Sequence, residues 1–212
     1  MGDKVDDKAQ LGATGVGKAP RTARGERTLR KILDGAREEF GERGFSDSSI
    51  VGITQRAGVA LGTFYTYFDS KEALFQALVR DMSAQVAETV APAFAGPSNA
   101  LDAARDGLEL FLRFAREHRH IYRIIDEAEF VDPAAYREHY DTTATRIAAR
   151  FIAARDKGEI AADLSDDDLE TLAWASMGAN VFLGLRYSVW ASADPRNIAA
   201  IANRLLRKGI CA

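Results

Sequence analysis

The sequence contains few cysteines and histidines and has no long hydrophobic run. A single cysteine among 212 residues, Cys211, excludes an internal disulfide framework and a cysteine-based metal cluster. The best candidate for a membrane span, residues 171–185, is uncharged but shorter than the roughly 20 residues that a spanning helix needs. The polar N-terminal segment lacks the apolar core of a secretory signal. We therefore expect a cytoplasmic protein that does not associate with a membrane.

Sustained period-two alternation of apolar and polar residues is also missing, as is any repeat at a fixed period. Apolar side chains recur instead at helical spacing, for example between Leu29 and Phe40 and between Leu101 and Ala115. Cap-like pairs such as Asp132-Pro133 and Asp194-Pro195 precede several of these stretches. With 47% apolar and 28% charged residues, the composition is that of an ordinary globular protein. The pattern predicts an all-α fold of about nine helices.

Charge is distributed unevenly along the chain. The formal net charge of −3 excludes a uniformly basic nucleic-acid coat. One short segment is nevertheless basic, since Glu26 is the one acid among six cations: Lys18, Arg21, Arg24, Arg27, Arg30 and Lys31. This arm has two interpretations, a solvated tail or a phosphate-seeking segment beside a nucleic-acid-binding module.

Signals for catalysis or cofactor binding are weak. Residues 12–18 match the first seven positions of a phosphate-binding P-loop, but Ala19 replaces the expected Ser or Thr and no strand precedes the segment. The three histidines, His118, His120 and His139, lack a spacing that would fix a metal site. No serine, cysteine or histidine has the setting of a nucleophile. We therefore expect no catalytic residue, no metal and no cofactor.

The most informative stretch is residues 45–71. It predicts two short helices joined by a tight turn at Gly58-Val59, which is the pattern of a helix-turn-helix, although an ordinary helical hairpin has the same spacing. The segment GFSDSSIVGITQRAGVALGTFYTYFDSKEALFQALV resembles the DNA-binding domain of the TetR (tetracycline-repressor-like) family of bacterial regulators. The match extends over about residues 27–86. It includes the EEFGERGF end of the preceding amphipathic helix.

The resemblance implies a division of the chain into three parts. Residues 1–24 are predicted to be a disordered basic tail, and residues 25–86 a three-helix DNA-binding domain with the helix-turn-helix. Residues 87–212 are then an all-helical domain for effector binding and dimerisation. The C-terminal sequences of this family diverge widely, so individual residues there do not carry over.

Within the motif, residues 60–67 are the predicted recognition helix. The hydroxyls of Thr63, Tyr65 and Tyr67 suit phosphate oxygens, and Gly62 permits close approach of the backbone to DNA. Lys71, at the start of the next helix, is expected to share a phosphate with that helix's N-terminal amides. Apolar contact from Ala60 or Leu61 suits a thymine methyl group. The full predicted DNA-binding set is Arg24, Arg27, Ser48, Ser49, Ala60, Leu61, Gly62, Thr63, Tyr65, Thr66, Tyr67 and Lys71.

Two positions depart from the family pattern. Leu61 stands where many members have a polar or basic residue, so that few hydrogen bonds to bases are expected. Gly52 occupies a helix-interior position that is usually acidic, at a local cost of about 1 kcal/mol relative to alanine. The sequence alone does not explain this glycine.

The remaining helices predict a dimer and a ligand pocket. Two recognition helices about one DNA turn apart, roughly 34–36 Å or a multiple, are needed to read a palindromic operator, so one motif per chain implies a homodimer. Its expected interface is the last two helices, residues 169–190 and 194–208, of which the first is apolar nearly all round; the alternative is a monomeric helical core. The predicted ligand-binding residues for a small, hydrophobic effector are Phe111, Phe114, His120, Tyr122, Arg123, Tyr140, Trp174 and Asn180.

The sequence thus predicts a homodimeric, ligand-responsive transcription regulator, most readily a repressor released from double-stranded DNA by its effector. Three alternatives stay open. One is a helical small-molecule-binding protein or enzyme in which the motif is vestigial. The others are a transcriptional activator and a nonspecific DNA binder.

Overall fold

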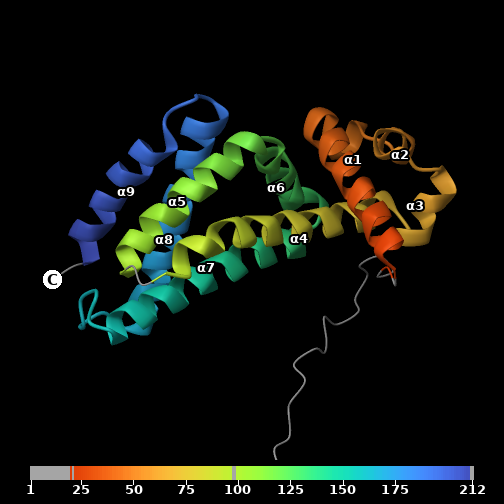
Figure 1. Ribbon diagram of the computed structural model, residues 1–212. Coiled ribbons are helices and arrows are strands. Elements are labelled where there is room, and N and C mark those ends of the chain that lie inside the picture. Colours follow the sequence, from red (N-terminus) through yellow and green to blue (C-terminus); the bar gives the residue numbers. More distant parts are fainter. Residues whose placement is uncertain (1–19, 21, 97–98, 211–212) are drawn as a thin grey trace, which may run out of the picture.

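The computed structural model describes residues 20, 22–96 and 99–210, and this part of the chain is helical and has no strand (Figure 1). It contains nine α-helices and two short turns of other helical geometry. The α-helices are α1 (Ala23–Asp47), α2 (Ile50–Ala57), α3 (Leu61–Tyr67), α4 (Lys71–Val90), α5 (Ala100–Glu117), α6 (His120–Val131), α7 (Pro133–Asp156), α8 (Asp166–Gly184) and α9 (Pro195–Ile210). The 3-10 turn η1 (Ala91–Phe94) follows α4, and the π-helical turn η2 (Leu185–Val189) follows α8. The predicted all-α fold is confirmed.

Three predictions concern residues that the structure does not describe in full. The P-loop-like segment 12–18 and Cys211 lie outside the described residues, as does most of the predicted tail, residues 1–24. At the end of that tail, Ala23 and Arg24 already belong to α1.

Helix α1 begins after Thr22, whose hydroxyl accepts a hydrogen bond from the Gly25 N–H at 3.1 Å. Its predicted apolar stripe faces inward, and Ile32, Ala36 and Phe40 are fully buried. The helix is interrupted at Gly44, where φ is +81°, a conformation that glycine adopts at little cost.

The two short helices of the motif follow directly. Ser49 caps α2 by accepting a hydrogen bond from the Gly52 N–H at 2.9 Å. Gly58 ends α2 in the left-handed conformation, with φ at +63°, and allows the sharp turn into α3. Ser70 then caps α4 by accepting a hydrogen bond from the Ala73 N–H at 3.1 Å. The local chemistry of serine caps and a glycine terminator therefore sets the geometry of the helix-turn-helix.

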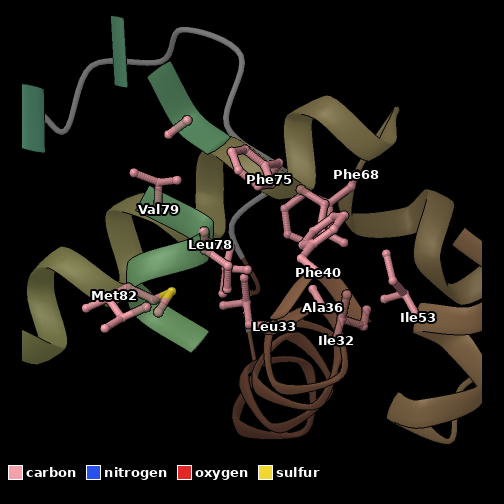
Figure 2. Close-up of a cluster of buried hydrophobic side chains, with 14 of the residues drawn as sticks. Ile32, Leu33, Ala36, Phe40, Ile53, Phe68, Phe75, Leu78, Val79 and Met82 are labelled. Atoms are coloured by element: carbon pink, nitrogen blue, oxygen red, sulfur yellow. The ribbon is translucent and has the colours of Figure 1, made fainter. Parts of the chain in front are cut away.

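A continuous apolar core holds α1–α4 together and extends into α6. Figure 2 shows Phe40, Phe68 and Phe75 meeting beside Ile53, and the rings of Phe40 and Phe75 are in edge-to-face contact at 5.2 Å. Ile124 of α6 belongs to the same cluster of buried side chains. The predicted division at residue 86 falls inside α4, which runs from the α1–α3 group into the C-terminal helices (Figure 1). The two predicted domains thus share both a helix and a core.

Polar caps also begin the C-terminal helices. Asp132 accepts from the Ala135 N–H ahead of α7, and Ser165 and Asp168 form a capping box at α8. The turn η2, which follows α8, is tied to α5 because the buried Ser188 hydroxyl donates to the Leu112 carbonyl at 2.8 Å. Among the described residues, no helix combines the length and apolarity needed to cross a membrane.

Candidate DNA-binding surface and effector cavity

Helix α3 presents one face to the core and the opposite face to solvent. Phe64 is fully buried, whereas Leu61 and Tyr65 are 44% and 49% exposed. Of the predicted DNA-binding residues, eight are exposed: Arg24, Arg27, Ser49, Ala60, Leu61, Gly62, Tyr65 and Thr66. Three are partly buried (Thr63, Tyr67 and Lys71) and one, Ser48, is buried.

The C-terminal end of α3 is joined to the start of α1. The Tyr67 hydroxyl donates a hydrogen bond to the Gly25 carbonyl at 3.1 Å. This bond places Arg24 and Arg27, on the first turns of α1, beside the recognition helix. The structure therefore places Arg24 and Arg27 near the C-terminal end of α3.

Lys71, which the sequence predicts to bind a phosphate, makes its hydrogen bonds within the protein. Its Nζ donates to the carbonyl oxygens of Phe45 at 2.7 Å and Ser48 at 3.0 Å, and lies 4.3 Å from the centre of the Phe45 ring. The ammonium group therefore fastens the end of α1 to the start of α4. The Ser48 hydroxyl likewise donates within the protein, to the Phe45 carbonyl at 2.7 Å.

An ion pair between the buried Glu39 and the exposed Arg56 explains Gly52. Glu39 of α1 is only 2% exposed, and its carboxylate accepts a hydrogen bond from Arg56 of α2 at 2.8 Å. A Cβ atom at residue 52 would lie 2.3 Å from the Glu39 Oε1 atom. Glycine is thus required because the carboxylate from α1 fills the space that any side chain on α2 would take. Glu39 lies on the apolar stripe of α1, where a charge needs a partner, and this position is the one signal of the pair in the sequence.

A cavity of about 950 Å³ lies among the helices of the C-terminal half. It is large enough for a drug-sized molecule. Four predicted ligand-binding residues line it: Phe111, Tyr122, Tyr140 and Asn180. Phe114, His120, Arg123 and Trp174 do not line it.

These four side chains have other surroundings. Phe114 is buried in the core shared with α1–α4. His120 packs on α1, where its ring occupies the space that a side chain at Gly41 would fill. Trp174 is 41% exposed. Arg123 donates to the carbonyl oxygens of Gly41 and Glu42, so its guanidinium faces the end of α1 and not the cavity.

One wall of the cavity carries a group of polar side chains. The Ser83 hydroxyl donates to the Val79 carbonyl at 2.8 Å and lies 2.6 Å from the Nδ1 atom of His139. Which of the two groups donates in the second bond depends on the tautomer of the ring. Burial lowers the pKa of His139 to about 4, so the ring is neutral near pH 7.

Asp126 and Tyr140 also belong to the cavity wall. Burial, reinforced by the nearby charge of Glu129, raises the pKa of Asp126 above its usual range. Burial also raises the pKa of Tyr140. Asn203 of α9 is 7% exposed, and its Oδ1 atom lacks a hydrogen-bond partner among the described residues. The mainly apolar cavity thus offers a few polar groups to a ligand, of which Asn203 is buried.

Helix α6 lies between the cavity and α1. Tyr122 and Asp126 line the cavity from α6, while Arg123 and Glu127 contact the end of α1. The Glu127 carboxylate accepts from the Phe45 N–H at 2.7 Å, immediately after the kink at Gly44. Helix α6 therefore contacts both the cavity and the end of α1.

The outer face of α8 and α9 carries a set of exposed large apolar side chains. Phe182 and Leu205 are 71% and 78% exposed. Trp190, just beyond η2, and Ile201 of α9 are exposed as well. Burying a large apolar side chain yields about 1.5–3 kcal/mol. Exposed large apolar side chains indicate a contact surface, and three of these, Phe182, Ile201 and Leu205, also line the cavity.

Within the described residues, no cluster of three or more His, Cys, Asp or Glu side chains is arranged to hold a metal ion.

Comparison with known proteins gives matches over the helix-turn-helix and over most of the chain. Residues 32–78 match the family model described as "Bacterial regulatory proteins, tetR family". The HTH-type transcriptional regulator UidR of Escherichia coli K12 is 28% identical over 182 residues, which cover 83% of this chain and 86% of UidR. The HTH-type transcriptional regulator YdgC of Bacillus subtilis is 28% identical over 192 residues, covering 89% and 95% of the two chains.

A solved structure has the same fold. It is that of a TetR-like transcriptional regulator from Rhodococcus sp. RHA1, which superposes with a TM-score of 0.69 at 23% identity and covers 90% of this chain and 98% of that one. The fold and the matched residues together confirm the resemblance that the motif predicted.

Proposed function

We propose that this chain, a member of the tetR family of bacterial regulatory proteins, is a homodimeric repressor that a small-molecule effector releases from a palindromic operator. The observation that carries the proposal is the exposed face of α3, fixed by Gly58 and flanked by the basic start of α1. The protein would act in the cytoplasm, where the chromosome lies. The relatives are transcriptional regulators, and we propose no enzymatic activity.

DNA recognition in this proposal combines positioning and readout. Arg24, Arg27 and Tyr65 contact phosphates, and Gly62 lets the backbone of α3 approach the groove. A Cβ atom at residue 62 would have no neighbour within 4 Å in the free protein, so the protein itself does not require this glycine. Leu61 and Ala60 supply apolar contacts to thymine methyl groups.

The proposed dimer forms through α8 and α9. Phe182, Ile201 and Leu205 are too exposed for a stable solvent-facing surface, and pairing with a second copy would bury them. Such a two-fold pairing places two α3 helices on one side of the dimer, as a palindrome demands. Leu205→Asp should therefore produce monomers in analytical ultracentrifugation. Phe130→Asp, which alters an 83% exposed side chain on α6, is the matched control and should leave dimers intact.

The effector is proposed to bind in the 950 Å³ cavity and to act through α6. A ligand that prefers one position of α6 shifts the population of dimers toward one spacing of the α3 helices. The hydrogen bonds of Arg123 and Glu127 with the end of α1 couple the position of α6 to the position of α1. Release from DNA then requires no unfolding of either part.

The proposal is tested by capturing fragments of the organism's own genome with the purified protein and sequencing them. Enrichment of a two-fold symmetric sequence supports it, and Tyr65→Ala should reduce the enrichment. Unselective recovery of fragments would instead indicate a nonspecific binder. Transcription from the captured promoter, with and without the protein, distinguishes a repressor from an activator.

A further inference from the structure

One face of α7 lines the cavity and is basic in its second half. His139, Thr143, Arg146 and Arg150 follow each other at intervals of three or four residues, so their side chains lie on the same side of the helix. Among the residues that the structure describes, neither Arg146 nor Arg150 has a carboxylate within 4 Å. By contrast, Arg105, which lines the cavity from α5, is paired with Asp102 and Asp106.

Arg150 is held in a defined position without using its hydrogen-bond donors. Its guanidinium carbon lies 3.5 Å from the centre of the Phe94 ring. That ring in turn packs on α5 at Gly107, where a Cβ atom would lie 2.9 Å from it. A guanidinium stacked on an aromatic ring keeps its N–H groups directed outward in its own plane. Arg150 is therefore oriented for a ligand by apolar contacts.

The pair is electrostatically unfavourable on its own. Like charges four residues apart on a helix repel each other. Burial, together with the charge of Arg146, lowers the pKa of Arg150. An anion that contacts both guanidinium groups would remove this repulsion and gain charge-assisted hydrogen bonds. The arrangement is thus suited to a negatively charged group at this end of the cavity.

We infer that the effector is an amphipathic organic anion, with an acidic head group bound by Arg146 and Arg150 and an apolar body in the cavity. This inference rests on the proposed function, since it takes the cavity to be the effector site. The apolar body would lie along α7, where Arg150 and His139 are about 16 Å apart at 1.5 Å per residue. Phe111, Ile121 and Leu183 supply apolar wall around it.

The test compares three probes that share a twelve-carbon chain: dodecanoate, dodecan-1-ol and dodecyltrimethylammonium. Isothermal titration calorimetry at submicellar concentrations gives each affinity for the full-length protein. Dodecanoate should bind at least about tenfold more tightly than the alcohol, as a charge-assisted hydrogen bond predicts. The cation should bind most weakly.

Variants locate the head group. Arg146→Met and Arg150→Met should each weaken dodecanoate by about tenfold and leave the alcohol unchanged. The control is Arg137→Met, an exposed arginine of α7 that does not line the cavity. Thr143→Trp, which places an indole in the cavity, should weaken all probes. If Arg150→Met does not fold, the more exposed Arg146 decides the question, supported by Arg150→Lys, which keeps the charge.

Equal affinities for acid and alcohol, or arginine variants that bind dodecanoate like the wild type, would overturn the inference and leave the cavity as a neutral-ligand site. Binding that Thr143→Trp does not affect would overturn it too, because the probe would lie elsewhere. Absence of binding by every probe would also overturn it. Operator affinity measured on the same samples shows separately whether the regulator proposal stands.

Discussion

The carboxylate of Glu127 accepts a hydrogen bond from the backbone N–H of Phe45 at 2.7 Å and so joins α6 to the end of α1. The neighbouring residue on α6, Asp126, lines the cavity. One turn of helix therefore contacts both the proposed effector site and the segment that precedes the helix-turn-helix. Arg123 adds a second connection between α6 and α1 by donating a hydrogen bond to the Glu42 carbonyl at 2.8 Å.

Replacing Glu127 by alanine should weaken the coupling between effector and DNA. The Phe45 N–H loses its acceptor, so a movement of α6 is passed on less completely to α1. With any compound that releases the wild type from its operator, the ratio of operator Kd values with and without that compound should fall by about fivefold, a typical size for coupling energies. Anisotropy titrations measure this ratio. Glu129→Ala, an exposed position on the same helix, is the control, and an unchanged ratio in Glu127→Ala would exclude this route.

Gly52→Ala should destabilise the protein by about 2 kcal/mol or more, because the added methyl group collides with the buried Glu39 carboxylate. Urea unfolding followed by circular dichroism measures the change. Gly62→Ala is the matched control on α3. Its added methyl group meets no atom within 4 Å, so its stability should stay within about 1 kcal/mol of the wild type. Equal stability of both variants would contradict the assigned role of Gly52.

Substitutions of Tyr65 and Lys71 should affect different properties, namely DNA affinity for Tyr65 and stability for Lys71. Tyr65→Ala removes a half-exposed side chain and should lower operator affinity about fivefold to tenfold with little loss of stability. Lys71→Met removes two hydrogen bonds to carbonyl oxygens and should lower stability by about 2 kcal/mol. Chemical unfolding and operator titration of both variants test this division. If Lys71→Met is as stable as the wild type and its DNA binding depends less on salt, Lys71 binds a phosphate and its role is not structural.

His139 should make the protein less stable in mild acid. Its pKa is about 4 in the folded protein and about 6.5 in an unfolded chain, so the unfolded state binds more protons between these values. The stabilisation is fully present above pH 6.5 and is lost as the pH falls toward 4, by about 3 kcal/mol at most. The free energy of unfolding of His139→Gln, measured at several pH values, should decline less over this range. Parallel curves for the two proteins would show that His139 is not the titrating group.

Much of the fold follows from local signals in the sequence. Gly58, Ser70, the Asp132-Pro133 pair and the Ser165/Asp168 capping box act within a few residues, so their structural roles are evident from the sequence alone. The helix-turn-helix follows for the same reason. Its apolar spacing and its turn glycine are both local.

The features that the sequence did not reveal depend on contacts between distant segments. Gly52 makes sense only beside Glu39, which is thirteen residues earlier on another helix. Arg123 was predicted to bind ligand because it is a polar group on an aromatic-rich helix, but the rotation of α6 directs it toward α1. Arg150 was not considered, since its significance comes from Phe94 and from the lack of a carboxylate around it. Such pairings across elements have no periodic signature.

The central claim is that α3 reads a specific DNA site as part of a dimer. Fluorescence anisotropy with the site recovered from the genome, and a scrambled duplex as control, tests it most directly at two salt concentrations. We predict selective binding at two chains per site, an affinity that falls steeply with salt because phosphate contacts release counterions, and a clear loss in Tyr65→Ala. Equal affinity for the scrambled duplex, or one chain per site, from a folded protein would contradict the account.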